Sequence, residues 1–170
     1  STQGELLVQH LRNNEHDVLL TRSPASTNLG HLVKELLDDD SIAINPLAEL
    51  LLFEASHAQN SFEVIMPSLK RNQIVICDRF TDSSIAYQGY GQKTDINMVK
   101  YINNKASYGL VPDLTILLDI APEDGLARTK TRQMTQQNDR IGDRSLEFHQ
   151  RVHNGYLSIA QNEVCFEIQD

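Results

Sequence analysis

Short runs of apolar residues alternate with longer amphipathic stretches along the chain. Four mainly aliphatic runs predict strands that are buried on both faces: 18–20, 74–77, 114–118 and 164–168. Between them, apolar residues recur at helical spacing, which predicts helices over 4–13, 29–37, 46–69, 96–105, 122–132 and 145–161. Because strands alternate with helices, the pattern predicts an α/β fold with a parallel sheet and helices on both faces.

Length and composition indicate one globular domain over residues 1–170. The apolar share is 40% and the formal net charge is −8. This acidic balance argues against nucleic-acid binding, although a few arginines can still converge on a small anion. No apolar run reaches the about 18 residues of a membrane span, so no membrane association is predicted. Cys77 and Cys165 lie in apolar runs without metal-site spacing, which indicates reduced thiols and a cytoplasmic location.

One polar stretch, residues 131–144, interrupts the pattern. It is rich in Gln, Asn, Thr, Asp and Arg and contains one Met and one Ile. Such a composition is typical of a surface loop and equally of a functional lid over a ligand site.

The residues that follow the predicted strands carry the candidate chemistry. Ligands of open parallel sheets bind at the carboxyl ends of the strands. Arg22 follows the first run, Asp78 and Arg79 follow the second, and Asp119 follows the third. Arginine offers a fork for phosphate oxygens, and a strand-end aspartate can hold Mg²⁺ or its waters. Together they favour phosphoryl chemistry, while each aspartate taken alone is equally consistent with a structural cap.

Two further groups have a ligand-binding interpretation and a structural one. Tyr87 and Gln88 place a ring and an amide after the second strand, where the amide can pair with the edge of a base. Their structural interpretation is a helix end capped by glycines. Phe53, with His57 four residues later, offers a stacking face for a base or an ordinary core contact.

These residues, in this order, resemble the thymidylate kinase family of P-loop nucleoside monophosphate kinases. The strand-end segment Cys-Asp-Arg-Phe-x-Asp-Ser-Ser-x-Ala-Tyr-Gln-Gly, which begins at Cys77, is the most specific match. Four other segments match in order along the chain: 22–24 (Arg-Ser-Pro), 51–59 (Leu-Leu-Phe-Glu-Ala-Ser-His-Ala-Gln), 112–126 and 148–156.

The resemblance implies transfer of the γ-phosphate of ATP to dTMP with Mg²⁺, on a P-loop NTPase-like fold. It implies that Phe53 stacks on thymine and that Arg22 and Arg79 hold the dTMP phosphate. The other positions that it assigns are Ser84, Tyr87, Gln88 and His57 in the nucleoside pocket, Asp78 near Mg²⁺, and the lid arginines Arg132 and Arg140 near the transferred phosphoryl group. It also implies a homodimer, for which residues 46–69 and 96–102 offer the candidate apolar faces.

The chain also departs from the family pattern. Ser1 and Thr2 resemble the residues just after the lysine of the phosphate loop, which places them at ATP and Ser1 also at Mg²⁺. We therefore expect a kinase-like domain that is truncated at both ends and lacks the first strand and the phosphate loop. The missing strand should leave an open slot in the sheet. We expect no useful turnover by the chain alone. Ser23 stands where the family has Glu, and His57 where it has Arg.

These departures leave two alternatives open. One is a catalytically inactive protein that uses the kinase fold for binding or structure. The other is a related nucleotide kinase with a changed choice of base.

Overall fold

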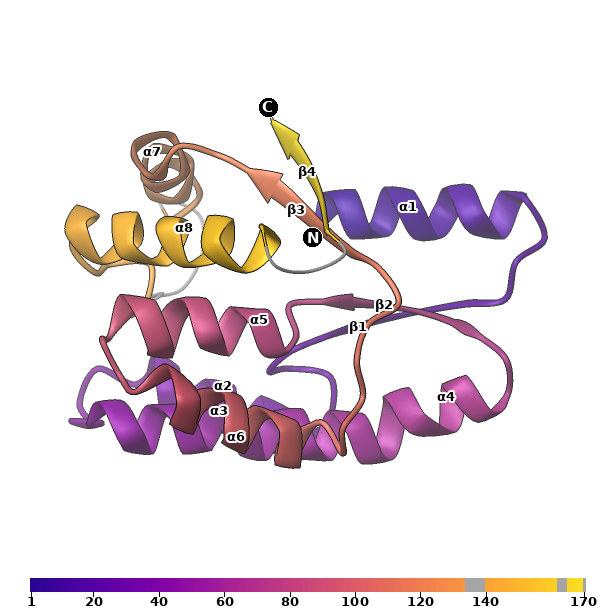
Figure 1. The fold of residues 1–170 in the computed structure, drawn as a ribbon, viewed down its shortest axis with the longest axis horizontal. Helices are drawn as coiled ribbons and strands as arrows, with labels where there is room; N and C mark the ends of the chain where they lie inside the picture. Colours follow the sequence, from indigo (N-terminus) through magenta and orange to yellow (C-terminus); the bar gives the residue numbers. More distant parts are fainter. Residues whose placement is uncertain (134–139, 162–164, 170) are drawn as a thin grey trace.

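The computed structural model describes the backbone of residues 1–133, 140–161 and 165–169, and the side chains of 1–129 and 140–161. Strands and helices alternate along most of the chain (Figure 1). The strands are β1 (Val18–Arg22), β2 (Ile74–Asp78), β3 (Thr115–Asp119) and β4 (Cys165–Gln169). The α-helices are α1 (Thr2–Asn13), α2 (Asn28–Asp38), α3 (Pro46–Asn60), α4 (Met66–Lys70), α5 (Thr81–Ser84), α6 (Ile96–Ala106), α7 (Pro122–Gln133) and α8 (Leu146–Ala160). Two π-helical stretches, η1 (Ser61–Ile65) and η2 (Ile85–Gly91), continue α3 and α5.

All strand pairing in the described part of the chain is parallel, as predicted. β1 pairs with β2, and β3 pairs with β4. The prediction of a single sheet of three or four strands was wrong about continuity, because the described strands form two separate pairs. The hydrogen-bond ladder is therefore interrupted between the two pairs.

Helices cover both faces of the β1–β2 pair. Figure 1 shows α1 on one side of these strands and the row of α3 and α4 on the other. Side-chain caps begin several of the helices: the Asn45 carboxamide oxygen accepts from the backbone N–H of Ala48 at 2.9 Å, and the Ser145 hydroxyl accepts from that of Phe148 at 3.3 Å. Ser145 therefore begins α8, where the helical pattern predicted a helix start.

The hydrophobic core lies mainly between helices. Leu50, Ile85 and Val99 bring together α3, η2 and α6, and Ile96 and Ile102 of α6 pack against them. A second cluster of Ala86, Phe148 and Val152 joins η2 to α8. Both clusters include residues of η2, so the segment that carries Tyr87 and Gln88 is held from two sides.

Gly155 of α8 is required by the close approach of this helix to η2. A Cβ atom at position 155 would lie 2.8 Å from Cγ of Tyr90, whereas one at Gly125 of α7 would lie 3.9 Å from its nearest neighbour, Cγ2 of Ile120. We expect Gly155→Ala to lower the free energy of unfolding by about 1–3 kcal/mol through overpacking. The matched Gly125→Ala variant should gain about 0.5–1 kcal/mol from helix propensity. Urea denaturation followed by circular dichroism measures both; equal effects would contradict this packing.

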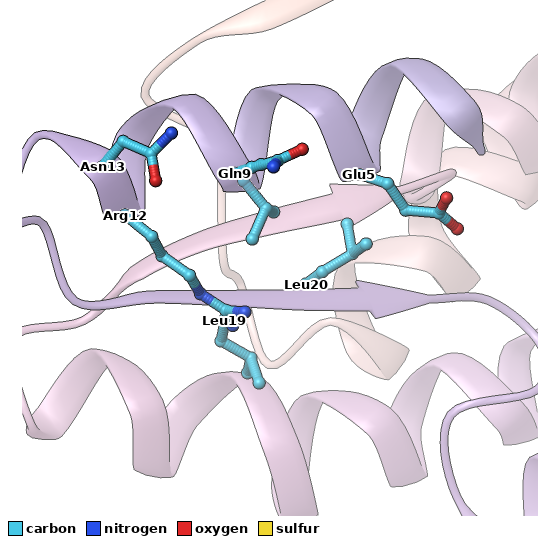
Figure 2. A pocket seen from close by; sticks show the side chains of 7 residues that line it. Glu5, Gln9, Arg12, Asn13, Leu19 and Leu20 are labelled. Atoms are coloured by element: carbon cyan, nitrogen blue, oxygen red, sulfur yellow. The ribbon is translucent and has the colours of Figure 1, made fainter.

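A depression of about 430 Å³ lies between α1 and β1 (Figure 2). Polar side chains of α1, including Glu5, Gln9 and Arg12, face Leu19 and Leu20 of β1 there. The Arg12 guanidinium donates to the Val18 carbonyl at 2.8 Å, so it secures α1 to the strand. This depression includes none of the strand-end residues that the sequence singles out. Among the described residues, no helix is long and apolar enough to cross a membrane.

Candidate active site

The carboxyl ends of β1 and β2 bring Arg22 and Asp78 together. The two residues are partners in the parallel register, and Nε of Arg22 lies 3.9 Å from Oδ2 of Asp78. The amino group of Ser1 lies 2.5 Å from the same carboxylate oxygen. Burial alone would raise the pKa of Asp78, but neighbouring groups, the charge of Arg22 and the hydroxyl of Ser1 among them, lower it below its ordinary value. Asp78 therefore stays ionised at neutral pH.

The beginning of α1 lies beside this carboxylate. Ser1 is the N-cap, and its hydroxyl accepts from the backbone N–H of Gly4 at 3.4 Å. Thr2 begins the helix and is exposed. Mg²⁺ in phosphate sites is commonly held by one or two carboxylates together with phosphate oxygens and water. A half-buried, ionised Asp78 beside the Ser1 hydroxyl is a donor set that fits such an ion.

The turn after β1 is held against β2 and α3. The backbone N–H of Ser23 donates to the Asp78 carbonyl at 3.3 Å, and the Ser56 hydroxyl of α3 donates to the Pro24 carbonyl at 2.8 Å. A Cβ at Gly30 would lie 1.9 Å from the Pro24 carbonyl oxygen, so only glycine fits there. These contacts fix the backbone from which Arg22 projects.

Arg79 follows β2 in a left-handed backbone conformation, with φ of 69°. Its guanidinium donates to the Tyr87 hydroxyl at 3.3 Å and lies 4.9 Å from the centre of the Tyr87 ring. Surrounding protein atoms alone would lower the pKa of Arg79, but Tyr87, Tyr156 and Asp78 raise it above its ordinary value. The side chain remains accessible to solvent. Among the described residues, no ion pair joins Arg79 to a carboxylate, so its charge is available to an anion.

Tyr156 of α8 completes this group. Its hydroxyl donates to the Ser83 hydroxyl at 2.9 Å, and its ring meets the Tyr87 ring edge-on, with 6.2 Å between the centroids. Burial raises the pKa of Tyr156 to about 12, against the lowering effect of Arg79. The hydroxyl therefore stays neutral beside the arginine.

Helix α3 presents polar side chains to α5 and to Phe80, the residue that precedes α5. The Ser84 hydroxyl donates to Oε1 of Glu54 at 2.6 Å. His57 is buried and stacks on Phe80, with 5.8 Å between ring centroids and 9° between planes. Burial lowers the pKa of His57 to about 4, so its ring is neutral. Phe53, on the same helix, is half-buried.

Burial raises the pKa of Glu54 from 4.5 to about 7, and the hydrogen bond from Ser84 lowers it only in part. A carboxyl with a raised folded-state pKa removes stability as the pH rises from about 4.5 to about 7. We expect Glu54→Gln, which cannot ionise, to gain roughly 3 kcal/mol relative to the natural chain across this window. His57 has the opposite effect, because its lowered pKa removes stability as the pH falls from 6.5 towards 4. This contribution cancels in the comparison, since both proteins contain His57. Urea denaturation at several pH values measures the difference.

The control for this prediction is Glu63→Gln. Glu63 is exposed and accepts from the Gln59 side chain one turn away. Its stability difference from the natural chain is the baseline for comparison. A difference for Glu54→Gln that changes with pH no more than this baseline would contradict the raised pKa of Glu54.

Gln88 and Arg140 meet at a buried carboxylate that sequence patterns did not single out. Glu49 of α3, which is 1% exposed, accepts from the Gln88 amide at 3.2 Å and from the Arg140 guanidinium at 3.4 Å. Arg132 lies in the last turn of α7, and its side chain lies outside the described residues. Of the predicted lid over 131–144, residues 134–139 also lie outside them, and the 140–144 turn leads into α8.

The structure brings several predicted residues together and adds others. Arg79 and Tyr87 share one contact group, Ser84 joins it to α3, and Arg22 lies beside Asp78. Asp119 pairs instead with His153 of α8, with 2.7 Å between Nε2 and Oδ1. The additions are Glu49, Glu54 and Tyr156. A signal for the first two was present in the sequence: a charged residue with apolar neighbours on both sides, in Ala-Glu-Leu and Phe-Glu-Ala.

A parallel α/β domain with arginines and an ionised aspartate at adjacent strand ends belongs to the class of phosphate-binding α/β proteins. The thymidylate kinase family profile matches residues 1–169. The chain is 45% identical to thymidylate kinase of Exiguobacterium sp. over 160 residues, covering 94% of this chain and 74% of that protein. It is 45% identical to thymidylate kinase of Geotalea daltonii over 168 residues, covering 96% of this chain and 78% of that protein.

Solved structures give the same result. The crystal structure of thymidylate kinase from Ehrlichia chaffeensis is 34% identical to the chain and superposes with a TM-score of 0.79, covering 98% of this chain and 83% of that one. The chain belongs to the thymidylate kinase family. The α/β fold and the family resemblance predicted from the sequence are thereby confirmed.

Proposed function

We propose that the residues described above bind dTMP and take part in transfer of the γ-phosphate of ATP to it. The reaction breaks the terminal P–O bond of ATP and forms one to a phosphate oxygen of dTMP, giving dTDP and ADP. The observation that carries the proposal is Arg79, a solvent-accessible guanidinium at the end of β2. Its contacts are aromatic and hydroxyl groups of Tyr87, so its charge remains available to a phosphate.

The neighbouring residues supply the other parts of a nucleotide site. Arg22 would add a second cation to the dTMP phosphate. Phe53 would stack on the base, and Ser84, Tyr87 and Gln88 would line the nucleoside pocket with His57 beneath it. Asp78 and Ser1 would hold Mg²⁺, which neutralises the phosphates of ATP when bound, and Thr2 would lie near them. Arg132 and Arg140 would approach the transferred group.

Isothermal titration calorimetry with dTMP, dUMP, dCMP and thymidine tests the binding part. We expect dTMP to bind most tightly, and thymidine weakly because it lacks the phosphate. Formation of dTDP from dTMP and ATP tests the transfer. Binding of dTMP without any dTDP would favour an inactive binding protein. Tighter binding of another nucleotide would favour a kinase with a changed base preference. The buried His57, which stands where the family has Arg, is the reason to test for it.

We also propose a homodimer. Part of the surface expected for it belongs to the core, since Ile96 and Ile102 of α6 pack against the Leu50 cluster. Among the apolar residues that stay exposed, one row lies on α2 and α3. It consists of Leu29, Leu32 and Leu36 at helical spacing, with Leu47 and Leu51 one turn apart. An exposed row of leucines across two packed helices is typical of a protein–protein interface.

Light scattering after gel filtration measures the oligomer. We expect a dimer for the natural chain and a monomer for Leu32→Glu, since Leu32 is 62% exposed in the middle of this row. The matched control is Val111→Glu, at an 81% exposed position outside α2 and α3. A monomeric natural chain, or a dimer that Leu32→Glu leaves intact, would contradict the interface.

A further inference from the structure

Glu49 is a buried carboxylate that accepts hydrogen bonds from four side chains. Oε1 accepts from Gln88 at 3.2 Å and from Gln92, and Oε2 accepts from Arg144 at 2.6 Å and from Arg140 at 3.4 Å. The donors come from η2, from its C-cap residue Gln92 and from the 140–144 turn, whereas Glu49 belongs to α3. A carboxylate offers about four lone-pair sites, so this one is fully used.

The environment of Glu49 pairs its carboxylate with two cations. A buried carboxylate is stable only when it is paired and hydrogen-bonded, and two guanidinium groups supply that pairing here. Arg144 is itself held by stacking on Phe148, with 4.6 Å between its central carbon and the ring centre. Glu49 also lies in the first turn of α3, where the helix dipole favours a negative charge.

The consequence for Gln88 is one fixed amide orientation. An ionised carboxylate only accepts, so the Gln88 side chain must turn its NH₂ group towards Glu49. Its carbonyl oxygen and its second N–H are then the groups that it can offer to a ligand. An acceptor beside a donor matches thymine, which has an N3–H donor beside the O4 acceptor. Cytosine presents the reverse order and would need the amide turned over.

We infer that Glu49 is a positioning residue that sets the base preference of the nucleoside site through Gln88 and joins that site to the arginines of the 140–144 turn. The inference rests on the proposed function, because Gln88 must face the base. It adds a specificity-determining residue that touches neither the nucleotide nor the transferred group. The arginines pair with the Glu49 carboxylate, and this carboxylate keeps the Gln88 amide in place.

The test is the ratio of dTMP to dCMP affinity, measured by calorimetry on the natural chain and on Glu49→Gln. A glutamine at position 49 can both donate and accept, so the Gln88 amide is free to turn over. We expect the ratio to fall about tenfold, the effect of losing one hydrogen bond to a charged group. A purely structural role would weaken both affinities by the same factor and leave the ratio unchanged.

Two further variants keep the inference falsifiable. Glu49→Asp retains the charge but shortens the side chain, so an intermediate ratio is expected even if Glu49→Gln does not fold. Glu63→Gln, which changes an exposed carboxylate near the end of the same continuous helix, should keep the natural ratio. If either variant folds and keeps the dTMP-to-dCMP affinity ratio of the natural chain, the inference is overturned while the proposed function stands. Absence of dTMP binding by the natural chain would overturn the proposed function and the inference with it.

Discussion

Residues 1–170, purified by themselves, are expected to form dTDP from dTMP and ATP many orders of magnitude more slowly than the roughly 1–100 s⁻¹ of ordinary kinases. None of the lysines in the printed sequence directly follows a glycine, so these residues contain no G-x-x-x-x-G-K-[ST] phosphate loop. Such a loop supplies backbone N–H groups and a lysine to the phosphates of ATP. Holding the reacting groups in line contributes roughly 7–11 kcal/mol to catalysis, and most of it would be lost.

A coupled assay of ADP release with ATP, Mg²⁺ and dTMP measures this turnover. Calorimetric binding of dTMP to the same preparation is the control, because it shows that the acceptor site is folded. Turnover near 1 s⁻¹ would mean that other residues hold ATP. It would also mean that the alignment of Ser1 and Thr2 with the end of a phosphate loop is wrong.

Replacing Arg79 with alanine is expected to weaken dTMP binding by about 2–4 kcal/mol, or roughly 30- to 1,000-fold. The guanidinium is the accessible cation beside Tyr87, and a phosphate contact in a sheltered site depends on its charge and forked shape. Calorimetry with dTMP gives the loss in affinity. Wherever dTDP formation can be measured, kcat/KM should fall by at least the same factor, since the contact persists in the transition state.

Three comparisons make this result specific. Thymidine has no phosphate, so its affinity should be nearly the same for both proteins. Arg79→Lys keeps the charge but loses the fork and should fall between them. Arg71→Ala is the matched control, because Arg71 lies before β2, where it donates to Ser68 and Gln73. An unchanged dTMP affinity in Arg79→Ala would refute the phosphate-binding role.

The strands and the strand-end residues followed from the sequence because their causes are local. A strand that is buried on both faces needs a continuous apolar run, so β1 and β2 were placed to within two residues at their ends. The carboxyl ends of parallel strands meet at one edge of a sheet, so the proximity of Arg22 and Asp78 could be expected before any coordinates. The ordered motifs around Phe53 and Arg79 were specific enough to indicate the family.

Which apolar helix faces are covered by the core and which stay exposed could not be predicted in the same way. Helical spacing identified an apolar face on α6, but only packing shows that Ile96 and Ile102 serve the core, whereas Leu32 of α2 stays exposed. Glu49 lies 39 residues before Gln88 and 95 before Arg144, and no periodicity connects positions so far apart.

The four strands, most of the helices, the residues at the strand ends and the family could therefore be predicted from the sequence, since these depend on neighbouring residues and on ordered motifs. The helix formed by α5 and η2 was not among the predicted helices. The tertiary structure alone decided which polar groups are buried together. Burial changes the chemistry of Glu54 and His57 because desolvation disfavours the charged form of each side chain. Desolvation depends on residues from distant segments of the chain that pack around the side chain. Ser84 contacts Glu54 in this way, and Phe80 contacts His57.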